Sequence, residues 1–252
     1  MKEENKTVFY AEQNKKMEEA YVKAQATFNY FWREVYWESK RVVPAHDLAL
    51  VKIPFQQVVE GRETPLVEHM WISDIDFDGE LITGVLKNSP NKLTNVAEGD
   101  TITRKLSEIS DWMLSIDRKT YGGYTIQVLR SGMTEEARKQ HDNAWGLDFG
   151  DPNNILVAYQ QEENEENLIE HPMSKAMEEP ARDYFTGNLD VVKAADENGV
   201  TRLHSETIAG NKTAVDILLE LGADKNAKTN TGKTALDFAI ALNWSHLIPV
   251  LQ

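Results

Sequence analysis

A six-residue segment recurs 33 residues later near the end of this chain of 252 residues. Residues 199–204, GVTRLH, are followed by residues 232–237, GKTALD, and the apolar pair Ile217-Leu218 is matched by Val250-Leu251 at the same distance. A fixed period of about 20–50 residues indicates repeated units that stack on one another and share a continuous core. This echo constrains the C-terminal part of the chain to a repeat architecture.

The second copy of the segment also resembles a phosphate-binding loop. Residues 227–234, AKTNTGKT, differ by one small residue from the pattern G-x-x-x-x-G-K-[ST]. That pattern requires a buried strand before the loop and a helix after it. The preceding residues, TAVDILLELGADKNAK, instead show the apolar spacing of a helix and a glycine-containing helix stop. We therefore predict that Lys233 lies in an exposed turn and that Thr234 begins a helix.

Four segments of this region resemble ankyrin repeats, whose unit is a turn followed by two antiparallel helices. They are TRLH, AGN, VDILLELGADKNAK and NTGKTALDFA. The proline of the T-P-L-H signature is replaced by Arg202 and Ala235, and its histidine is kept as His204 but becomes Asp237. The resemblance implies a degenerate domain of about two and a half repeats over residues 173–252. It assigns structural roles to Gly199, Thr201, Leu203, His204, Gly210, Gly222, Ala223, Asp224, Gly232, Thr234 and Leu236.

Ankyrin arrays bind protein partners, so the resemblance implies a protein partner for this chain. About three repeats are needed for a stable stack, and a tail this short is expected to lean on the domain before it. Two interpretations carry equal weight: the tail caps the preceding domain, or it forms a partner-binding surface.

The front part of the chain predicts an α+β domain over residues 1–160, joined by an acidic linker over residues 161–172. Residues 12–40 predict a helix, because apolar side chains recur there at spacings of three and four. Strand patterns follow, including two runs that flank the hairpin dipeptide Asp78-Gly79. We expect the helix to lie on a curved, mainly antiparallel sheet of about five or six strands. Residues 124–130, YTIQVLR, are predicted as a strand, and residues 134–160 as a short helix, a loop and a closing strand.

Two stretches of this domain resemble the bacterial YegJ-like domain of unknown function. They are EHMWISDIDFDGELITGVLKNSP and VAEGDTITRKLSEISDWMLSIDRKTYGGYTIQVL. The helix with KMEEAYVKAQATFNYFW and the following DLALVKIPF resemble the opening of that family, so the match spans residues 12–130. The resemblance supports this architecture, and some members of the family also carry ankyrin repeats. It implies no reaction, substrate or cofactor.

The composition narrows the classes of partner. The formal net charge of −14 repels a phosphate backbone, so we expect no nucleic-acid partner. A basic protein partner, or no specific partner, is more compatible with this charge. The chain contains no cysteine, which excludes disulfides and thiolate chemistry and removes the usual ligands of structural zinc. No apolar run reaches the ~20 residues that span a bilayer, and the first residues lack the apolar segment of a secretion signal. We expect a cytoplasmic protein without membrane partners or cofactors.

Candidate chemistry is sparse. Residues 74–79, DIDFDG, match half of a calcium loop, but its twelfth position is Val85 where a glutamate is needed, and a hairpin tip explains the same letters. A serine nucleophile needs a base within hydrogen-bonding reach, and the histidines are remote in sequence from Ser110. Turn and packing roles are favoured over chemical roles for the remaining candidates. The candidate surface or pocket consists of His69, Trp71, Ser110, Asp111, Trp112, Tyr121 and Tyr124, with no catalytic or metal-binding residue assigned.

These observations favour a non-catalytic protein that binds another protein through an acidic surface bearing aromatic residues. An antidote to a basic toxin, or an adaptor, is a concrete version of this hypothesis. The alternative is a small-molecule binder or enzyme with its pocket on the N-terminal sheet, and it requires Trp71, His69, Trp112 and Asp111 to converge on one cleft. A regulatory appendage without a ligand is the third hypothesis. Because no residue set pairs a nucleophile or acid with a recognisable partner, an enzyme is disfavoured.

Overall fold

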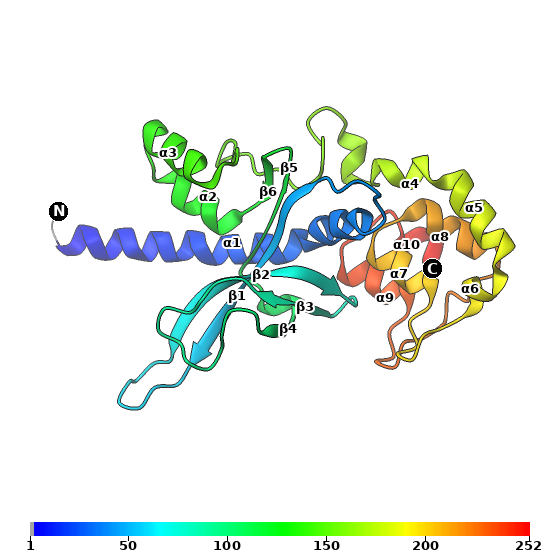
Figure 1. Ribbon diagram of the computed structural model, residues 1–252, viewed down its shortest axis with the longest axis horizontal. Helices are drawn as coiled ribbons and strands as arrows, with labels where there is room; N and C mark the ends of the chain where they lie inside the picture. The colour runs from blue at the N-terminus through cyan, green and yellow to red at the C-terminus, as the bar shows by residue number, and fades with distance from the viewer. Residues whose placement is uncertain (1–2) are drawn as a thin grey trace. The chain divides into compact units, whose positions relative to one another are not determined.

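The computed structural model describes the backbone of residues 3–252 and the side chains from residue 14 onward. The chain forms two compact units (Figure 1). The N-terminal unit consists of the chain up to Phe31 together with Val42–Val157, and the helical unit consists of Trp32–Arg41 together with Ala158–Gln252. The first helix therefore contributes residues to both units.

The predicted N-terminal helix is confirmed as α1 (Glu3–Glu38). Its apolar stripe is buried: Ala24, Phe28 and Phe31 are each fully shielded from solvent. The Phe28 ring lies 5.1 Å from that of Phe77, and the Phe31 ring lies 5.6 Å from that of Trp112. The helix thus packs on the sheet through the residues whose spacing predicts it.

Six strands form one sheet in the order β4-β3-β2-β1-β5-β6, and every neighbouring pair is antiparallel. This confirms the expected helix on an antiparallel sheet. Side chains directly opposite each other on neighbouring strands lie on the same face. Val51, Ile72 and Trp112 therefore form one row that faces α1, and the residues beside them project from the other face. The strands are β1 (His46–Gln57), β2 (Leu66–Phe77), β3 (Leu81–Leu86), β4 (Thr101–Lys105), β5 (Asp111–Ile116) and β6 (Lys119–Gly122).

Two strand predictions are wrong. Residues 124–130 form a helix, α2 (Tyr124–Ser131), because Gly123 adopts a left-handed backbone conformation (φ 69°) and the Asp111 carboxylate accepts the first N–H groups of the helix. The expected closing strand is absent from the described chain after α3 (Glu135–Trp145). Asp148 makes a single bridge to Lys119, and Leu156 accepts one hydrogen bond from the Gly122 N–H, but no ladder forms.

A second apolar cluster lies on the face of the sheet opposite α1. Met113, Ile126, Leu147 and Phe149 form its buried centre, with Leu48, Leu50 and Trp71 packed around them. Helix α2 and the segment that follows α3 thus cover this face. Both faces of the central strands are buried, which explains the uninterrupted burial of β5.

The remaining residues fold into short helices. Trp244 is 1% exposed and donates a hydrogen bond to the Ile208 carbonyl (3.1 Å). Its ring presses against Gly210 so closely that a Cβ there would lie 2.5 Å from it. No described helix combines the length and the apolar character needed to cross a bilayer. The elements are η2 (Glu165–Leu168), α4 (Pro172–Ala176), α5 (Glu178–Gly187), α6 (Leu189–Lys193), α7 (Arg202–Ile208), α8 (Lys212–Glu220), α9 (Ala235–Ala241) and α10 (Ile248–Leu251).

Candidate functional site

A lysine occupies the centre of the sheet face opposite α1. Lys52 lies on β1 between its cross-strand neighbours Trp71 on β2 and Asp111 on β5. Its ammonium lies 4.6 Å from the centre of the Trp71 ring and donates a hydrogen bond to the Thr125 hydroxyl (2.9 Å). Burial lowers the pKa of Lys52, and the Asp111 carboxylate opposes this effect. The row therefore places an aromatic ring, a cation and an acid side by side across three strands.

Asp111 is fully buried and positions α2. Its carboxylate accepts hydrogen bonds from the backbone N–H groups of Trp112 (2.9 Å), Tyr124 (3.0 Å) and Thr125 (2.8 Å), and from the Thr125 hydroxyl (2.5 Å). Burial raises its pKa to about 6, although these hydrogen bonds and Lys52 favour the charged form. Hydrogen bonds from backbone N–H groups at the start of a helix to one carboxylate are typical of a helix cap, so the main role of Asp111 is structural.

A histidine–serine pair lies beside this row. His69 Nδ1 and Ser110 Oγ are 2.9 Å apart, and the Tyr21 ring stacks on the imidazole with a centroid distance of 5.6 Å. Burial and the charge of Lys52 lower the pKa of His69, which favours the neutral base. Within residues 14–252, no carboxylate hydrogen-bonds the imidazole. The Ser110 hydroxyl also donates to the Lys52 carbonyl (3.2 Å). The pair therefore has a hydroxyl and a base in contact, without the acid that orients the base in a triad.

The structure brings four of the seven candidate residues together: His69 bonds Ser110, and Trp71 and Asp111 flank Lys52. Trp112 lies on the opposite face, where its indole N–H donates to the Thr27 hydroxyl (3.2 Å). Tyr121 pairs with Leu114 in the sheet and is 2% exposed. Tyr124 reaches Asp111 through its backbone N–H alone, and its hydroxyl contacts Thr27 (2.8 Å). The predicted convergence is therefore partial, because Trp112 does not join it.

Three further residues of this site are absent from the sequence-based set: Tyr21, Lys52 and Thr125. A signal existed for Lys52, which stands inside the otherwise apolar run LALVKIPF. A lysine at a half-buried strand position next to apolar neighbours requires a partner for its charge. Tyr21 and Thr125 carried no such signal, because both fit ordinary helical positions.

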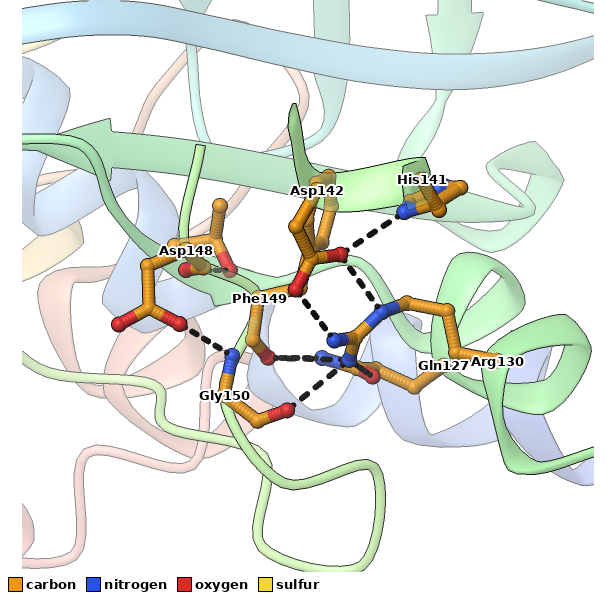
Figure 2. A network of polar contacts seen from close by, with 8 residues as sticks. Gln127, Arg130, His141, Asp142, Asp148, Phe149 and Gly150 are labelled. Carbon is orange, nitrogen blue, oxygen red and sulfur yellow. Dashed lines mark hydrogen bonds and ion pairs between the residues drawn. The ribbon is translucent and has the colours of Figure 1, made fainter. Parts of the chain in front are cut away.

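A polar network of the N-terminal unit surrounds Arg130 and is shown in Figure 2. The guanidinium is 2% exposed and binds the Asp142 carboxylate through Nε (3.1 Å) and Nη2 (2.7 Å). Its Nη1 donates to the Gln127 side chain (2.6 Å) and to the carbonyls of Phe149 (3.4 Å) and Gly150 (3.0 Å). His141 also bonds Asp142 (2.9 Å). These bonds join α2, α3 and the segment after α3, so the network is structural.

In the helical unit, the two copies of the repeated segment have the same local structure. Thr201 caps α7: its backbone N–H donates to His204 Nδ1 (3.0 Å), and its hydroxyl accepts from the His204 N–H (3.4 Å). Thr234 caps α9 in the same way, with Asp237 in place of the histidine (2.8 and 3.2 Å). The change from histidine to aspartate thus preserves a reciprocal cap. Helix α8 precedes Ala227, as predicted, and Lys233 is exposed in a turn.

The other ankyrin-like positions have turn or core roles. Gly199 and Gly232 have φ values of 75° and 79° in equivalent turns, and Gly222 has 87° after α8. Leu203 is 1% exposed and Leu236 is half-buried. The helix stop and turn after α8 involve Ala223, whose N–H donates to the Leu218 carbonyl, and Asp224, whose carboxylate accepts from the Asn226 N–H.

Within residues 14–252, no group of three or more His, Asp or Glu side chains is placed to hold a metal ion. In the segment that resembles a calcium loop, the Asp78 carboxylate accepts the N–H groups of Glu80 (2.8 Å) and Leu81 (2.7 Å) in the turn between β2 and β3. Asp78 therefore closes a hairpin.

Comparison with known proteins relates both parts of the chain to bacterial proteins. Residues 14–149 match the family described as "Uncharacterized protein conserved in bacteria (DUF2314)". The Neisseria meningitidis protein named "Putative ankyrin repeat protein NMB1133/NMB1171" is 46% identical over 246 residues, which cover 97% of this chain and 96% of the relative. The Escherichia coli "Uncharacterized protein YegJ" is 42% identical over 83 residues, covering 33% of this chain and 50% of the relative. The resemblance to YegJ is thus confirmed, and the chain belongs to the DUF2314 family.

Proposed function

We propose that this protein is a non-catalytic binding protein that recognises another protein through its helical unit, as an antidote or an adaptor does. In this proposal, α5–α10 form a short stack of ankyrin-type repeats attached to the DUF2314 domain. The partner carries a basic surface, because complementary charge accelerates association with an acidic protein.

The observation that carries the proposal is the contact between equivalent turns. Asn230 donates from its side chain to the Glu197 carbonyl (2.9 Å) and from its backbone to the Asn198 carbonyl (2.8 Å). Asn230 and Glu197 are 33 residues apart, which equals the period of the sequence echo. Stacked repeats require contacts between each repeat and the next, and this hydrogen bond joins two residues that are one repeat period apart. The name of the Neisseria relative, which covers nearly the whole chain, supports the same architecture.

The charge of the helical unit supports a basic partner. Three carboxylates of α5 are exposed: Glu178, Glu179 and Asp183. Glu178 is partly neutralised by Arg182, whose guanidinium lies 3.8 Å away and also binds Glu220. Glu179 and Asp183 are thus the better candidates for steering a cationic surface. Such exposed charges affect association rates more than final affinity, and salt screens them.

Capture from native lysate with the immobilised full-length chain tests the proposal. We expect a specific protein to be retained by the wild type, with retention at least tenfold weaker for the double variant Glu179→Lys/Asp183→Lys and weaker at high salt. The matched control Glu60→Lys/Glu63→Lys reverses two exposed charges of the N-terminal unit and should retain the partner. The proposal is refuted if mass spectrometry finds no specific protein, or if both double variants retain it equally.

The histidine–serine pair supports a second candidate function, a small-molecule site with acid–base chemistry on the sheet. Its motivating observation is the 2.9 Å contact between His69 and Ser110 beside Lys52. A fluorophosphonate tests it: Ser110 Oγ would bond to phosphorus, fluoride would leave, and His69 would take the proton. We expect labelling of the wild type, at least tenfold slower labelling of His69→Gln, and none of Ser110→Ala. The exposed Ser107→Ala is the control, and an unlabelled wild-type Ser110 excludes this function.

A further inference from the structure

A pocket of about 190 Å³ opens within the helical unit. The C-terminal end of α1 forms one side of it, and α4, α5, α7 and the start of α8 form the rest. Its walls are mainly apolar, with Ala181, Phe185 and Ala214 among them, and Tyr184 lies at the rim with 54% of its surface exposed. The pocket therefore offers an apolar ligand a shielded interior and an accessible entrance.

Two uncharged buried donors of this pocket lack acceptors, and among the described residues the Nε of the pocket-lining Arg202 lacks one too. Trp37 is 4% exposed and Ser174 is 2% exposed, and within the described residues neither the indole N–H of Trp37 nor the Ser174 hydroxyl has a hydrogen-bond partner. Both side chains line the pocket. Buried polar groups in folded proteins are nearly always paired, because an unpaired one costs free energy. The combination indicates that a ligand supplies the missing acceptor.

The carboxylate of Glu206, which lines the pocket, already accepts hydrogen bonds from two side chains. Glu206 is 2% exposed and accepts from Arg202 Nη2 (2.5 Å) and Asn211 Nδ2 (2.8 Å). Two cations, Lys40 and Arg202, also line the pocket, so the charge of Glu206 does not by itself exclude a ligand anion. Burying a carboxylate carries a large desolvation cost, whereas a neutral carbonyl oxygen satisfies the uncharged donors of Trp37 and Ser174 at a smaller cost. The acceptor that fits best is therefore a neutral carbonyl oxygen.

The size of the pocket limits the apolar part of the ligand. A dry cavity of about 150 Å³ accommodates benzene, whereas pockets for drug-sized molecules measure about 300–1,000 Å³. A volume of about 190 Å³ thus suits one large apolar side chain. An apolar side chain attached to a carbonyl is the chemistry of a residue in a peptide.

We propose that this pocket binds one apolar side chain of a partner protein, leucine or larger, whose backbone carbonyl accepts hydrogen bonds from Trp37 and Ser174. This inference rests on the proposed function and names the anchor of the partner. Because Glu178 and Glu179 begin α5 next to the pocket-lining Pro180 and Ala181, residues flanking the anchor are basic.

Titration of the full-length, ¹⁵N-labelled chain with capped amino acids tests the pocket without a partner. The Trp37 indole N–H signal is assigned from its loss in Trp37→Phe. We expect N-acetyl-leucine methylamide to move this signal downfield with a dissociation constant of about 1 mM, as the small number of contacting atoms suggests. N-acetyl-glycine methylamide lacks the side chain, and N-acetyl-leucine carries a carboxylate that is costly to desolvate, so both should bind at least about tenfold more weakly.

Three variants locate the site. Ala181→Leu fills the pocket and should abolish the shift, whereas Ala144→Leu adds the same volume to an exposed position of α3 and should preserve it. Ser174→Ala removes one donor and should weaken binding about threefold to tenfold, and Ser205→Ala should not. The pocket assignment is overturned if saturating leucine diamide leaves the Trp37 signal unmoved or if Ala181→Leu binds it like the wild type.

The capture assay separates the two proposals. If a specific partner is captured equally by the wild type and Ala181→Leu, the pocket does not hold its anchor and the proposed function stands. If the leucine diamide binds but no protein is captured, the proposed function fails, and with it the assignment of the pocket to a protein side chain.

Discussion

Replacing Arg130 with methionine should lower the free energy of unfolding of the N-terminal unit by about 3–5 kcal/mol. The guanidinium is buried, and its bonds to Asp142, Gln127 and two backbone carbonyls shown in Figure 2 leave it fully engaged. Removing it leaves the Gly150 carbonyl without its donor and the Asp142 carboxylate with His141 alone, whereas the Phe149 carbonyl keeps its bond from Gln127 Nε2 (2.6 Å). Such uncompensated acceptors cost more than the intact pair contributes, because desolvation is no longer offset.

Urea unfolding followed by hydrogen exchange at α2 and α3 measures this loss for the unit that contains them. Arg130→Lys keeps the charge but loses the planar fork, so it should recover only part of the stability. Arg62→Met, at an exposed loop position, is the matched control and should change stability by less than about 0.5 kcal/mol. A loss below about 1 kcal/mol for Arg130→Met would show that the network is not needed for the fold.

Replacing Asp111 with alanine should destabilise the N-terminal unit by about 3–4 kcal/mol. The change strands the N–H groups of Trp112, Tyr124 and Thr125 inside the protein, and each buried unpaired group costs about 1–3 kcal/mol, partly recovered by relaxation. Asp111→Asn keeps one acceptor and should cost less. Circular dichroism and thermal unfolding measure both, with the exposed Asp76→Ala as the control.

The pH dependence of this loss has a definite sign. The pKa of Asp111 is about 6 in the folded protein and 3.8 as its ordinary value, so the folded state holds the proton more tightly. The contribution of Asp111 to stability is therefore most favourable below about pH 4 and declines as the pH rises through 6. Between pH 7.5 and 4.5, the stability of the wild type relative to Asp111→Asn should rise by about 2 kcal/mol. A constant difference over that range would contradict the raised pKa.

Local patterns predict the elements of this protein better than its sites. The stripe that includes Phe28 and Phe31 predicts α1, and Asp78-Gly79 marks the turn between β2 and β3, because both signals lie within a few residues. The pattern of residues 124–130 predicts a strand where α2 forms, because the carboxylate that caps this helix, Asp111, lies 13 residues before Tyr124 on another element. No local pattern contains that information.

The candidate site shows the same limit. His69 and Ser110 are 41 residues apart, and only the pairing of β2, β1 and β5 brings them together. Arg130 and Asp142 look like ordinary surface charges of two helices until both helices cover the sheet. Exposed tryptophans are scarce: over the described side chains, Trp145 is the one tryptophan that is more than a third exposed, at 42%. Most tryptophans of this sequence are therefore core residues.

The division of α1 between two compact units determines which fragments of this protein can be expressed separately or combined with other domains. Arg33, Glu34 and Trp37 are buried among side chains of the C-terminal region, and Glu34 contacts His171 (3.1 Å). A clone that starts at Ala158 would omit these residues and expose the surfaces they cover. The ankyrin-like tail therefore cannot be transferred to another protein on its own, because its unit includes residues of the first helix.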